Sequence, residues 1–407
     1  MFKIQKLSFV ALIVAVFLIG GICGGILVGT LPPGLRGGPG ADTGVGTGAQ
    51  GDSDASVSDE SVARVRQLAK YLEDNFYKPI TSGAIETGLL RGLFLSPGDP
   101  YTVYYTQAEF EKTMEATHGE MSGVGITLTR NDDGFIEIIS VIEGSPASEA
   151  GLMGGDLLLS VDGKRYTGEQ LTEAVEAARG EPGVAVVIGI SRDGREKDYT
   201  IKRSVFVAPT VVHEIMANAS GDAVGYIGVA SFNDNTSVDF ESALKEMNEG
   251  GVKGIVIDVR NNAGGLVDKA VEMDDMLLDK GLICYAEDAR GERIEYATED
   301  GRTTDLPYAV LIDETSVSAA EIFALGIKAE GGGKLVGGTT FGKGLIQKLE
   351  KFEAGDGVRI TIMQYVTPDG DPVNGVGIAP DIPVEQPEGA KPGTPSDAQL
   401  SKALALF

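Results

Sequence analysis

Two residue types that carry much of enzyme chemistry are scarce in this sequence. Its 407 residues include only two histidines, His118 and His213, and two cysteines, Cys23 and Cys284. Neither histidine stands in a context that suggests catalysis, so little histidine is available to activate a nucleophile. The cysteines lie far apart, one of them in an apolar N-terminal stretch, which argues against an internal disulfide and leaves no zinc ligand set. The sequence therefore predicts no metal site and no cofactor.

Positive charge is also in short supply, since 34 lysines and arginines stand against 60 aspartates and glutamates and the net charge is −26. Contact with nucleic acid phosphates needs a basic surface, so nucleic acid is excluded as a partner. The acidity is typical of a soluble, exported domain. Apolar residues make up 42% of the chain, enough for a globular core, and the length predicts two or three domains.

Charge is absent altogether from residues 7–31, a run of 25 residues preceded by Lys3 and Lys6. A helix of this length spans a hydrocarbon core of about 30 Å. A cleavable signal peptide has a shorter apolar region of roughly 7–15 residues. Lipidation at Cys23 is disfavoured by the bulky Ile22 before it. We therefore expect an uncleaved signal anchor at 1–31, a single transmembrane helix in the cell membrane with the remaining chain outside the cytoplasm.

Composition and periodicity divide the rest of the chain into five segments. Residues 32–58 are rich in Gly, Pro, Ser, Thr and Asp, which predicts a flexible linker. Residues 59–117 show helical periodicity in part. Residues 118–204 form a compact unit of short strands and helices. Residues 205–384 alternate strands with helices, which predicts an α/β core, and residues 385–407 form a tail with a short helix.

The compact unit carries the sequence Gly123-Val124-Gly125-Ile126, which alone is no more than a tight turn. Ser145-Pro146-Ala147 and Gly155-Asp156 follow it, and the three segments together resemble a PDZ domain in the circularly permuted bacterial order. The resemblance implies that backbone N–H groups of residues 123–126 hold the C-terminal carboxylate of an extended peptide. Gly154 stands where proline is more usual, which predicts a looser turn there.

The first candidate for chemistry is Ser318, at the end of a strand and the start of a helix. Ser318-x-x-Glu321 matches a capping box, so an ordinary helix N-cap is one interpretation of this serine. A helix N-terminus also suits a nucleophile, because its free amides can stabilise an oxyanion. Ser316, two residues upstream, is the nearest rival for the same role.

The second candidate is Lys343, flanked by Gly342 and Gly344, with Gln347 four residues further on. An offset of four places Lys343 and Gln347 on one face of either a helix or a strand. Two alternatives compete: a surface lysine beside a turn, and a phosphate-binding loop at 337–343. The second requires Ser or Thr after the lysine, where this chain has Gly344.

The third candidate is the turn Asn261–Gly265, where a buried strand runs into a helix through paired glycines. A dinucleotide-binding loop is the alternative, but its Gly-x-Gly-x-x-Gly pattern is absent. Paired glycines let backbone amides approach a reacting carbonyl closely.

These motifs in this order resemble the C-terminal processing (tail-specific) peptidase family, from about residue 61 to residue 384. The resemblance implies Ser318 as nucleophile, Lys343 as its base and Gln347 as the residue that orients the lysine, with the family's separation of 25 residues between the first two. Ala263 replaces the proline usual in the glycine turn.

A Ser–Lys pair can work only if the lysine is neutral, although its unperturbed pKa is about 10.4. Burial lowers the pKa of a lysine, and the apolar neighbours Phe341, Leu345 and Ile346 are expected to supply that burial. The oxyanion of the acyl-enzyme reaction is expected to bind backbone amides. The candidate amides are those of Gly264, Gly265 and Ala319.

The sequence thus predicts a mixed α/β Ser–Lys peptidase core with an inserted α+β PDZ domain and an N-terminal transmembrane helix. Its expected partners are proteins or peptides with free, apolar C-termini and the membrane, and a homo-oligomer is compatible with the sequence. The PDZ domain interrupts the catalytic unit, so tail binding is expected to select or gate substrates. The alternative is a non-catalytic PDZ scaffold that retains an inactive peptidase core.

Overall fold

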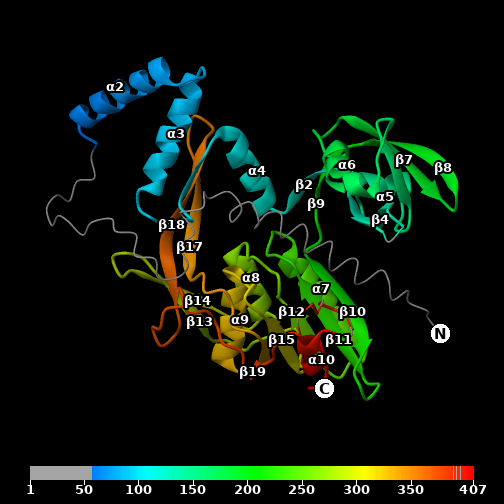
Figure 1. Cartoon of the computed structure of the whole chain (residues 1–407). Coiled ribbons are helices and arrows are strands. Elements are labelled where there is room, and N and C mark those ends of the chain that lie inside the picture. The colour runs from blue at the N-terminus through cyan, green and yellow to red at the C-terminus, as the bar shows by residue number, and fades with distance from the viewer. Residues whose placement is uncertain (1–56, 132, 388, 391, 395) are drawn as a thin grey trace. The chain divides into compact units, whose positions relative to one another are not determined.

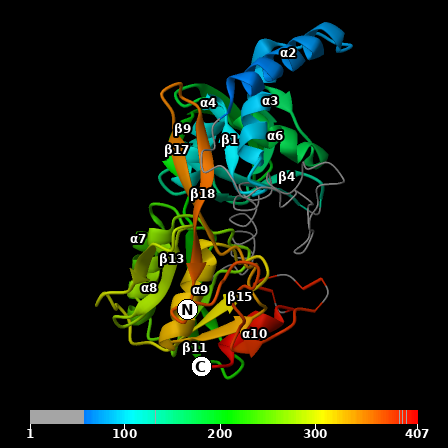
Figure 2. The ribbon, with the colours of Figure 1, turned by 90° about the vertical axis from the view of Figure 1, so that its left-hand side faces the viewer.

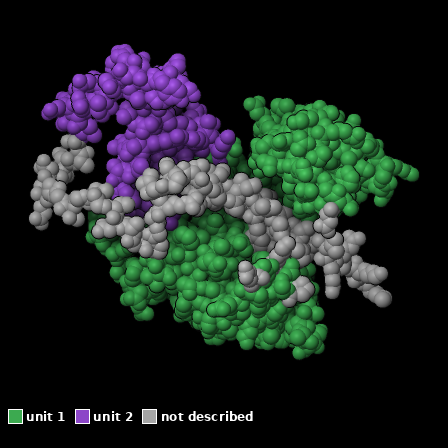
Figure 3. Space-filling view, in the orientation of Figure 1, with its two compact units in different colours: residues 1–30, 113–346, 363–407 green, residues 31–112, 347–362 purple. Residues whose placement is uncertain are grey.

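The computed structural model describes residues 57–387 and 389–407, except 132, 391 and 395 (Figure 1). The predicted anchor at 1–31 lies outside the described residues. Within the described part of the chain, no helix combines the length and apolarity needed to cross a membrane. The described residues form two compact units (Figure 3): a larger one of residues 113–346 and 363–407, and a smaller one of residues 57–112 and 347–362.

A six-stranded sheet organises one part of the larger unit. Its strands, in spatial order, are β10 (Val211–Ala217), β11 (Ala223–Val229), β12 (Ile255–Asp258), β15 (Tyr308–Ile312), β16 (Lys334–Gly337) and β19 (Ile382–Pro383). β10 pairs antiparallel with β11 and all other pairs are parallel. β12 and β15 are buried at every position, as expected for strands covered on both faces.

Helices cover both faces of this sheet (Figure 2). One face packs against α7 (Thr236–Glu249), α8 (Val267–Asp275) and α9 (Ala319–Glu330), and the other packs against α10 (Ala398–Leu404). Successive residues of a strand point to opposite faces. Accordingly Ile255 and Ile257 join the first core, whereas Val256 joins the second. A hairpin of β13 (Leu282–Glu287) and β14 (Arg293–Ala297) completes this part.

A second sheet in the larger unit forms the PDZ-like domain. Its strands are β3 (Ile126–Arg130), β4 (Ile136–Val141), β5 (Leu157–Val161), β6 (Lys164–Arg165), β7 (Ala185–Arg192) and β8 (Arg195–Lys202), with helices α5 (Pro146–Ala150) and α6 (Leu171–Ala178). β3 is an edge strand of the sheet, paired with β4 alone. The looser turn predicted at Gly154 stays a prediction, but a Cβ there would lie 2.7 Å from the Ile139 carbonyl oxygen. That glycine permits close packing.

The smaller unit contains α2 (Asp59–Asn75), α3 (Ser82–Leu95), β1 (Val103–Tyr105) and most of α4 (Gln107–Thr117). It also contains most of the strands β17 (Leu345–Lys351) and β18 (Gly357–Val366). β1 pairs antiparallel with β18, which ties the two sequence segments of this unit together.

Asp274 of α8 is an unusual member of the core of the larger unit. It is fully buried, and neither carboxylate oxygen has a hydrogen-bond partner among the described residues. A Cβ on Gly326 of α9 would overlap this carboxylate, so the glycine leaves room for it. Burial without a partner raises the pKa of Asp274 well above its usual range. Burial, and secondarily Asp274, raises the pKa of the Cys284 thiol to about 12.

Replacing Asp274 with asparagine is expected to stabilise the protein increasingly as the pH rises above about 4. The unfolded chain ionises an aspartate near pH 3.9, whereas the raised pKa of Asp274 means that the folded protein binds this proton up to a higher pH. Wild-type stability therefore falls by up to about 1.4 kcal/mol for each pH unit above that value, until the raised pKa is reached. Urea unfolding of both proteins between about pH 3.5 and 7.5 measures the difference. A difference that does not change with pH would contradict the assignment.

Candidate active site

Ser318 begins α9 in a strained backbone conformation. Its φ is 58° and its ψ is −115°, values that a residue with a side chain seldom adopts. Ordinary caps of this protein differ: Ser58 and Thr81 have extended backbones, and their side chains accept from amides of the first helical turn. Of the capping box predicted at Ser318, the bond from the Ser318 N–H to the Glu321 side chain is present at 2.9 Å, whereas the Glu321 N–H donates to the Ser318 backbone carbonyl at 2.8 Å. Backbone strain of this kind costs about 1–3 kcal/mol and clusters at active sites.

The two candidate serines occupy different environments. Ser316 is fully buried, and its hydroxyl donates to the Val259 carbonyl at 2.8 Å and accepts from the Asp313 N–H at 3.2 Å. Ser318 is only partly buried. The hydroxyl of Ser316 is thus committed to holding the loop before α9, whereas Ser318 lies where a substrate has access.

The glycine turn predicted beside the nucleophile does lie against Ser318. A Cβ on Gly264 would be 2.9 Å from the Ser318 Cβ and 3.0 Å from the Ala319 nitrogen, so only glycine permits this approach. The turn is tied to the same loop by a hydrogen bond from the Val317 N–H to the Asn262 carbonyl, at 2.9 Å.

The three candidate oxyanion amides are not equivalent. The Gly264 N–H donates to the Asn262 side-chain oxygen at 2.8 Å, and this bond shapes the turn. The N–H groups of Gly265 and Ala319 have no acceptor within the described part of the chain. These two amides are therefore the ones left to donate to an oxyanion.

Lys343 is tied to Ser318 through the buried carboxylate of Glu321. One oxygen of Glu321 accepts from the backbone N–H groups of Ser318 at 2.9 Å and Lys343 at 2.8 Å. The other accepts from the Gly342 N–H at 2.7 Å and the Thr340 hydroxyl at 2.6 Å. Sequence reasoning saw in Glu321 only a capping residue. The structure shows that it joins the backbones of both candidate catalytic residues.

The surroundings of Lys343 agree with the sequence only in part. Lys343, Leu345 and Ile346 are partly buried, and Ile346 packs against the core of the larger unit. Phe341, predicted to help bury the lysine, instead leaves 57% of its surface exposed. The reason is that residues 340–344 form a loop held by backbone contacts, which leaves Phe341 at the surface.

Gln347 belongs to the smaller unit. Its side-chain nitrogen donates to the Thr361 hydroxyl at 3.2 Å, and that hydroxyl donates to an Asp99 carboxylate oxygen at 2.6 Å. This chain of hydrogen bonds fixes the glutamine within its own unit. Its action on Lys343 stays a prediction.

A buried ion network is centred on Arg260, the residue directly before the glycine turn. The sequence analysis did not predict this network. The Arg260 guanidinium donates to Asp258 at 2.6 and 2.9 Å, to Asp397 at 2.9 Å, and to Gln399 at 2.9 Å. Arg260 and both aspartates are at most 1% exposed. Burial favours a higher pKa for Asp397, but hydrogen bonds led by Arg260 outweigh it and leave the pKa below its usual value. The available signal was Asp258-x-Arg260 at the end of the buried strand β12.

The predicted carboxylate loop of the PDZ-like domain lies between β2 (Glu120–Gly123) and β3. Val124 is buried, and its carbonyl accepts from the Ala147 N–H at 2.8 Å. The Gly125 carbonyl accepts from the Ile142 N–H at 2.9 Å, and a Cβ on Gly125 would overlap the Ser145 side chain. The loop carbonyls are therefore used inside the domain.

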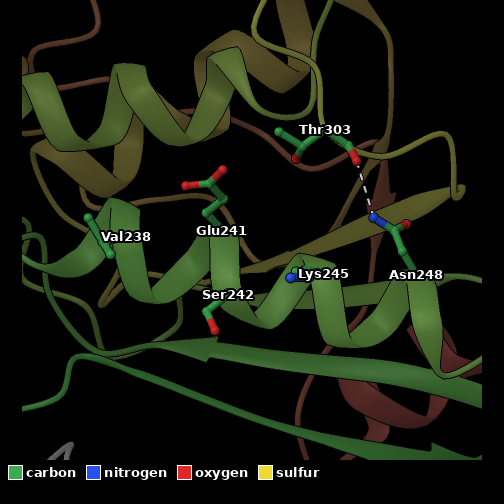
Figure 4. A pocket seen from close by; sticks show the side chains of 6 residues that line it. All are labelled: Val238, Glu241, Ser242, Lys245, Asn248 and Thr303. Atoms are coloured by element: carbon green, nitrogen blue, oxygen red, sulfur yellow. Dashed lines mark hydrogen bonds between the residues drawn. The ribbon is translucent and has the colours of Figure 1, made fainter.

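A surface pocket of about 450 Å³ lies along α7 (Figure 4). Its lining residues are Val238, Glu241, Ser242, Lys245, Asn248 and Thr303. None of the candidate catalytic residues is among them, so we assign it no part in the chemistry. In the described ranges, no group of three or more His, Cys, Asp or Glu side chains is placed to hold a metal ion.

An α/β core with an accessible, strained serine at a helix start, joined to a PDZ-like domain, defines the class of PDZ-containing serine hydrolases. Residues 223–384 match peptidase family S41, and residues 137–192 match the PDZ domain family. The chain belongs to peptidase family S41, among the carboxy-terminal processing proteases, and is a serine peptidase. The resemblance seen in the sequence is therefore confirmed, as are the mixed α/β fold and the PDZ domain.

The relatives cover most of this chain. It is 31% identical over 343 residues to the carboxy-terminal processing protease CtpA of Bacillus subtilis, covering 84% of this chain and 72% of the relative. It is 31% identical over 332 residues to the "Probable CtpA-like serine protease" of Staphylococcus haemolyticus, covering 81% and 66% respectively. A solved structure of the photosystem II D1 C-terminal processing protease is 27% identical, with a TM-score of 0.48 and coverage of 79% and 86%.

Proposed function

We propose that this serine peptidase cleaves extracytoplasmic proteins near their C-termini, with Ser318 as nucleophile and Lys343 as general base. The observation that carries the proposal is the Glu321 carboxylate, which binds the backbone N–H groups of both residues. A shared anchor sets the spacing of nucleophile and base before the substrate binds. The entropy cost of aligning the two residues in the transition state is therefore lower.

The reaction follows from these groups. The neutral Lys343 amine takes the Ser318 hydroxyl proton as the oxygen attacks the scissile carbonyl carbon. The amides of Gly265 and Ala319 hold the oxyanion, and Gly264 keeps the turn in place. The lysine ammonium then protonates the leaving amine, the C–N bond breaks and an acyl-enzyme remains. Water then attacks the acyl carbon and gives a proton to Lys343. The bond between that carbon and the Ser318 oxygen breaks, and Lys343 returns the proton to the serine as the new C-terminal carboxyl group is released. In this proposal Gln347 orients the lysine.

The PDZ-like domain supplies the preference for chain ends. Its edge strand β3 can accept an extended peptide by strand addition, and the loop at residues 123–126 receives the terminal carboxylate. Apolar tails suit the domain because an uncharged side chain has little hydration free energy to lose when it enters a groove. The uncharged run at residues 7–31 supports a membrane anchor that places the peptidase outside the cytoplasm.

Replacing Ser318 with alanine is expected to lower the cleavage rate of an unfolded, apolar-tailed protein by at least about a thousandfold. Lys343→Ala should have a similar effect near pH 7, because no base remains. Ser316→Ala is the matched control: it removes a buried hydrogen bond worth about 1–3 kcal/mol, so it lowers the melting temperature and retains most of the activity. Equal rates for wild type and Ser318→Ala would favour the inactive PDZ scaffold.

A further inference from the structure

A chain of hydrogen bonds in the smaller unit ends on the side chain of Gln347. Gln347 lies on β17, and Thr361 lies on the paired strand β18 (Figure 1). Asp99 belongs to the segment between α3 and β1, and the pairing of β1 with β18 brings this segment to the same sheet. Three segments that are separate in the sequence therefore meet in one cluster of polar side chains.

The Asp99 carboxylate is held in the position from which it binds Thr361. One of its oxygens accepts from the Tyr101 N–H at 3.0 Å, and the other accepts from the hydroxyls of Thr102 and Thr361, both at 2.6 Å. Thr102 is buried, and its hydroxyl also accepts from the Thr361 N–H at 3.2 Å. Burial favours a higher pKa for Asp99, but hydrogen bonds led by that of Thr102 outweigh it and leave the pKa below its usual value. Asp99 is therefore a carboxylate at neutral pH.

The number of protons in this chain of hydrogen bonds decides which end of the Gln347 amide faces Thr361. A carboxylate has no proton to donate, so the single hydroxyl proton of Thr361 points to Asp99. Towards Gln347 the hydroxyl can then only accept, and it accepts from the side-chain nitrogen at 3.2 Å. The amide nitrogen is thereby committed to Thr361, and the amide oxygen is the end left for another donor.

The direction of this amide matters to a lysine that acts as a base. A neutral amine takes up a proton through its lone pair and still has N–H groups to donate. An amide oxygen accepts from such an N–H group and leaves the lone pair free for the proton of the serine. An amide NH₂ group would instead donate to the lone pair and block it. Of the two directions, the one that Thr361 selects is the one that keeps a lysine base competent.

We propose that Asp99 and Thr361 are positioning residues of the peptidase, which fix the direction of the Gln347 amide so that its oxygen is the group available to Lys343. The inference deepens the proposed function and rests on it, because it takes Lys343 as the base and Gln347 as the residue that orients it. Neither Asp99 nor Thr361 has to touch the substrate, since both act through the glutamine. A carboxylate 262 residues before Thr361 in the sequence thereby contributes to the reaction.

Thr361→Val tests the inference, because valine keeps the shape of the side chain and removes the hydroxyl. It is expected to lower kcat on an unfolded, apolar-tailed protein about tenfold or more with KM nearly unchanged, since misplacing a group beside the reacting atoms is costly in rate. Thr361→Ser keeps a hydroxyl and should retain most of the activity. Thr106→Val is the matched control: its hydroxyl also donates to a carboxylate of the same unit, that of Glu109 at 2.9 Å, and its loss should leave kcat unchanged.

A double-mutant cycle shows whether Thr361 acts through Gln347. Gln347→Ala removes the amide and is expected to lower kcat by itself. Thr361→Val added to Gln347→Ala should cause no further loss, whereas two independent effects would multiply. A merely structural role of the Thr361 hydroxyl would lower kcat equally in both backgrounds. Circular dichroism and the melting temperature establish that each variant is folded.

Asp99→Ala is the second variant if Thr361→Val does not fold. Without the carboxylate, the Thr361 proton can point to Gln347 and the amide can turn round. We expect kcat to fall about three- to tenfold in the wild-type background and to stay constant in the Gln347→Ala background.

The inference is overturned if the folded variants of Thr361 and Asp99 keep more than about half of the wild-type kcat, or if their losses multiply with that of Gln347→Ala. Failure of the proposed function looks different. In that case Ser318→Ala cleaves like the wild type, or Gln347→Ala alone keeps the wild-type kcat, which removes the role that Asp99 and Thr361 are proposed to support.

Discussion

Glu321→Gln is expected to lower kcat about a hundredfold or more, although it changes only one atom. The carboxylate accepts hydrogen bonds on both oxygens, from Ser318 and Lys343 on one and from Gly342 and Thr340 on the other. An amide can accept on one side only, so its NH₂ group must face two donors whichever way it is placed. Breaking either pair of bonds shifts the nucleophile or the base, and small misplacements of reacting groups are costly in rate.

The effect of Glu321→Gln should appear in kcat, with KM and tail-peptide affinity nearly unchanged, because Glu321 is expected to touch neither substrate nor PDZ-like domain. Glu314→Ala, an exposed residue before the same motif, is the control and should retain full activity. Circular dichroism and the melting temperature distinguish a shift of the catalytic residues in a folded enzyme from unfolding of the variant. A folded Glu321→Gln enzyme that keeps more than about a tenth of the wild-type kcat would show that Ser318 and Lys343 hold their places without it.

Arg260→Met is expected to destabilise the larger unit by about 3–5 kcal/mol, the cost of leaving a buried charge without its partner. Asp258 and Asp397 are both fully buried, and the methionine offers neither of them a hydrogen bond. Urea unfolding at neutral pH measures the loss. Arg165→Met is the matched control, because its ion pair with Glu196 has a similar length but both side chains are 65% exposed. Such surface pairs contribute about 0–1 kcal/mol.

The destabilisation by Arg260→Met should also depend on pH. The lowered pKa of Asp397 stabilises the folded wild type above its unfolded pKa near 3.9, and this contribution is lost as the pH falls through the folded value. The gap between wild type and Arg260→Met should therefore narrow in acid, because the protonated aspartates no longer need a cation. A gap that stays constant down to about pH 2 would contradict a charge-based role for the network.

Strands and helices with a strong local signal were predictable. β11, β15 and α9 lie in residues 205–384, the stretch for which the sequence predicts alternating strands and helices. Unbroken apolar runs mark the two strands, and Gly331 in a left-handed conformation ends the helix. The hairpin β13–β14 was not predicted, because residues 293–297 alternate charged and apolar side chains over a largely exposed strand.

The sequence by itself determined the order of the motifs, the family, and the candidate pair Ser318 and Lys343, because motif spacing is a property of the chain alone. The motif register already favoured Ser318 over Ser316, and the tertiary structure added the physical difference, because Ser316 is fully buried with its hydroxyl hydrogen-bonded inside the protein. Only the tertiary structure decided the second role of Glu321 and the bond between Arg260 and Asp397, 137 residues apart. A single sequence contains no signal for which distant side chains meet, because contact is decided by how strands, turns and helices pack.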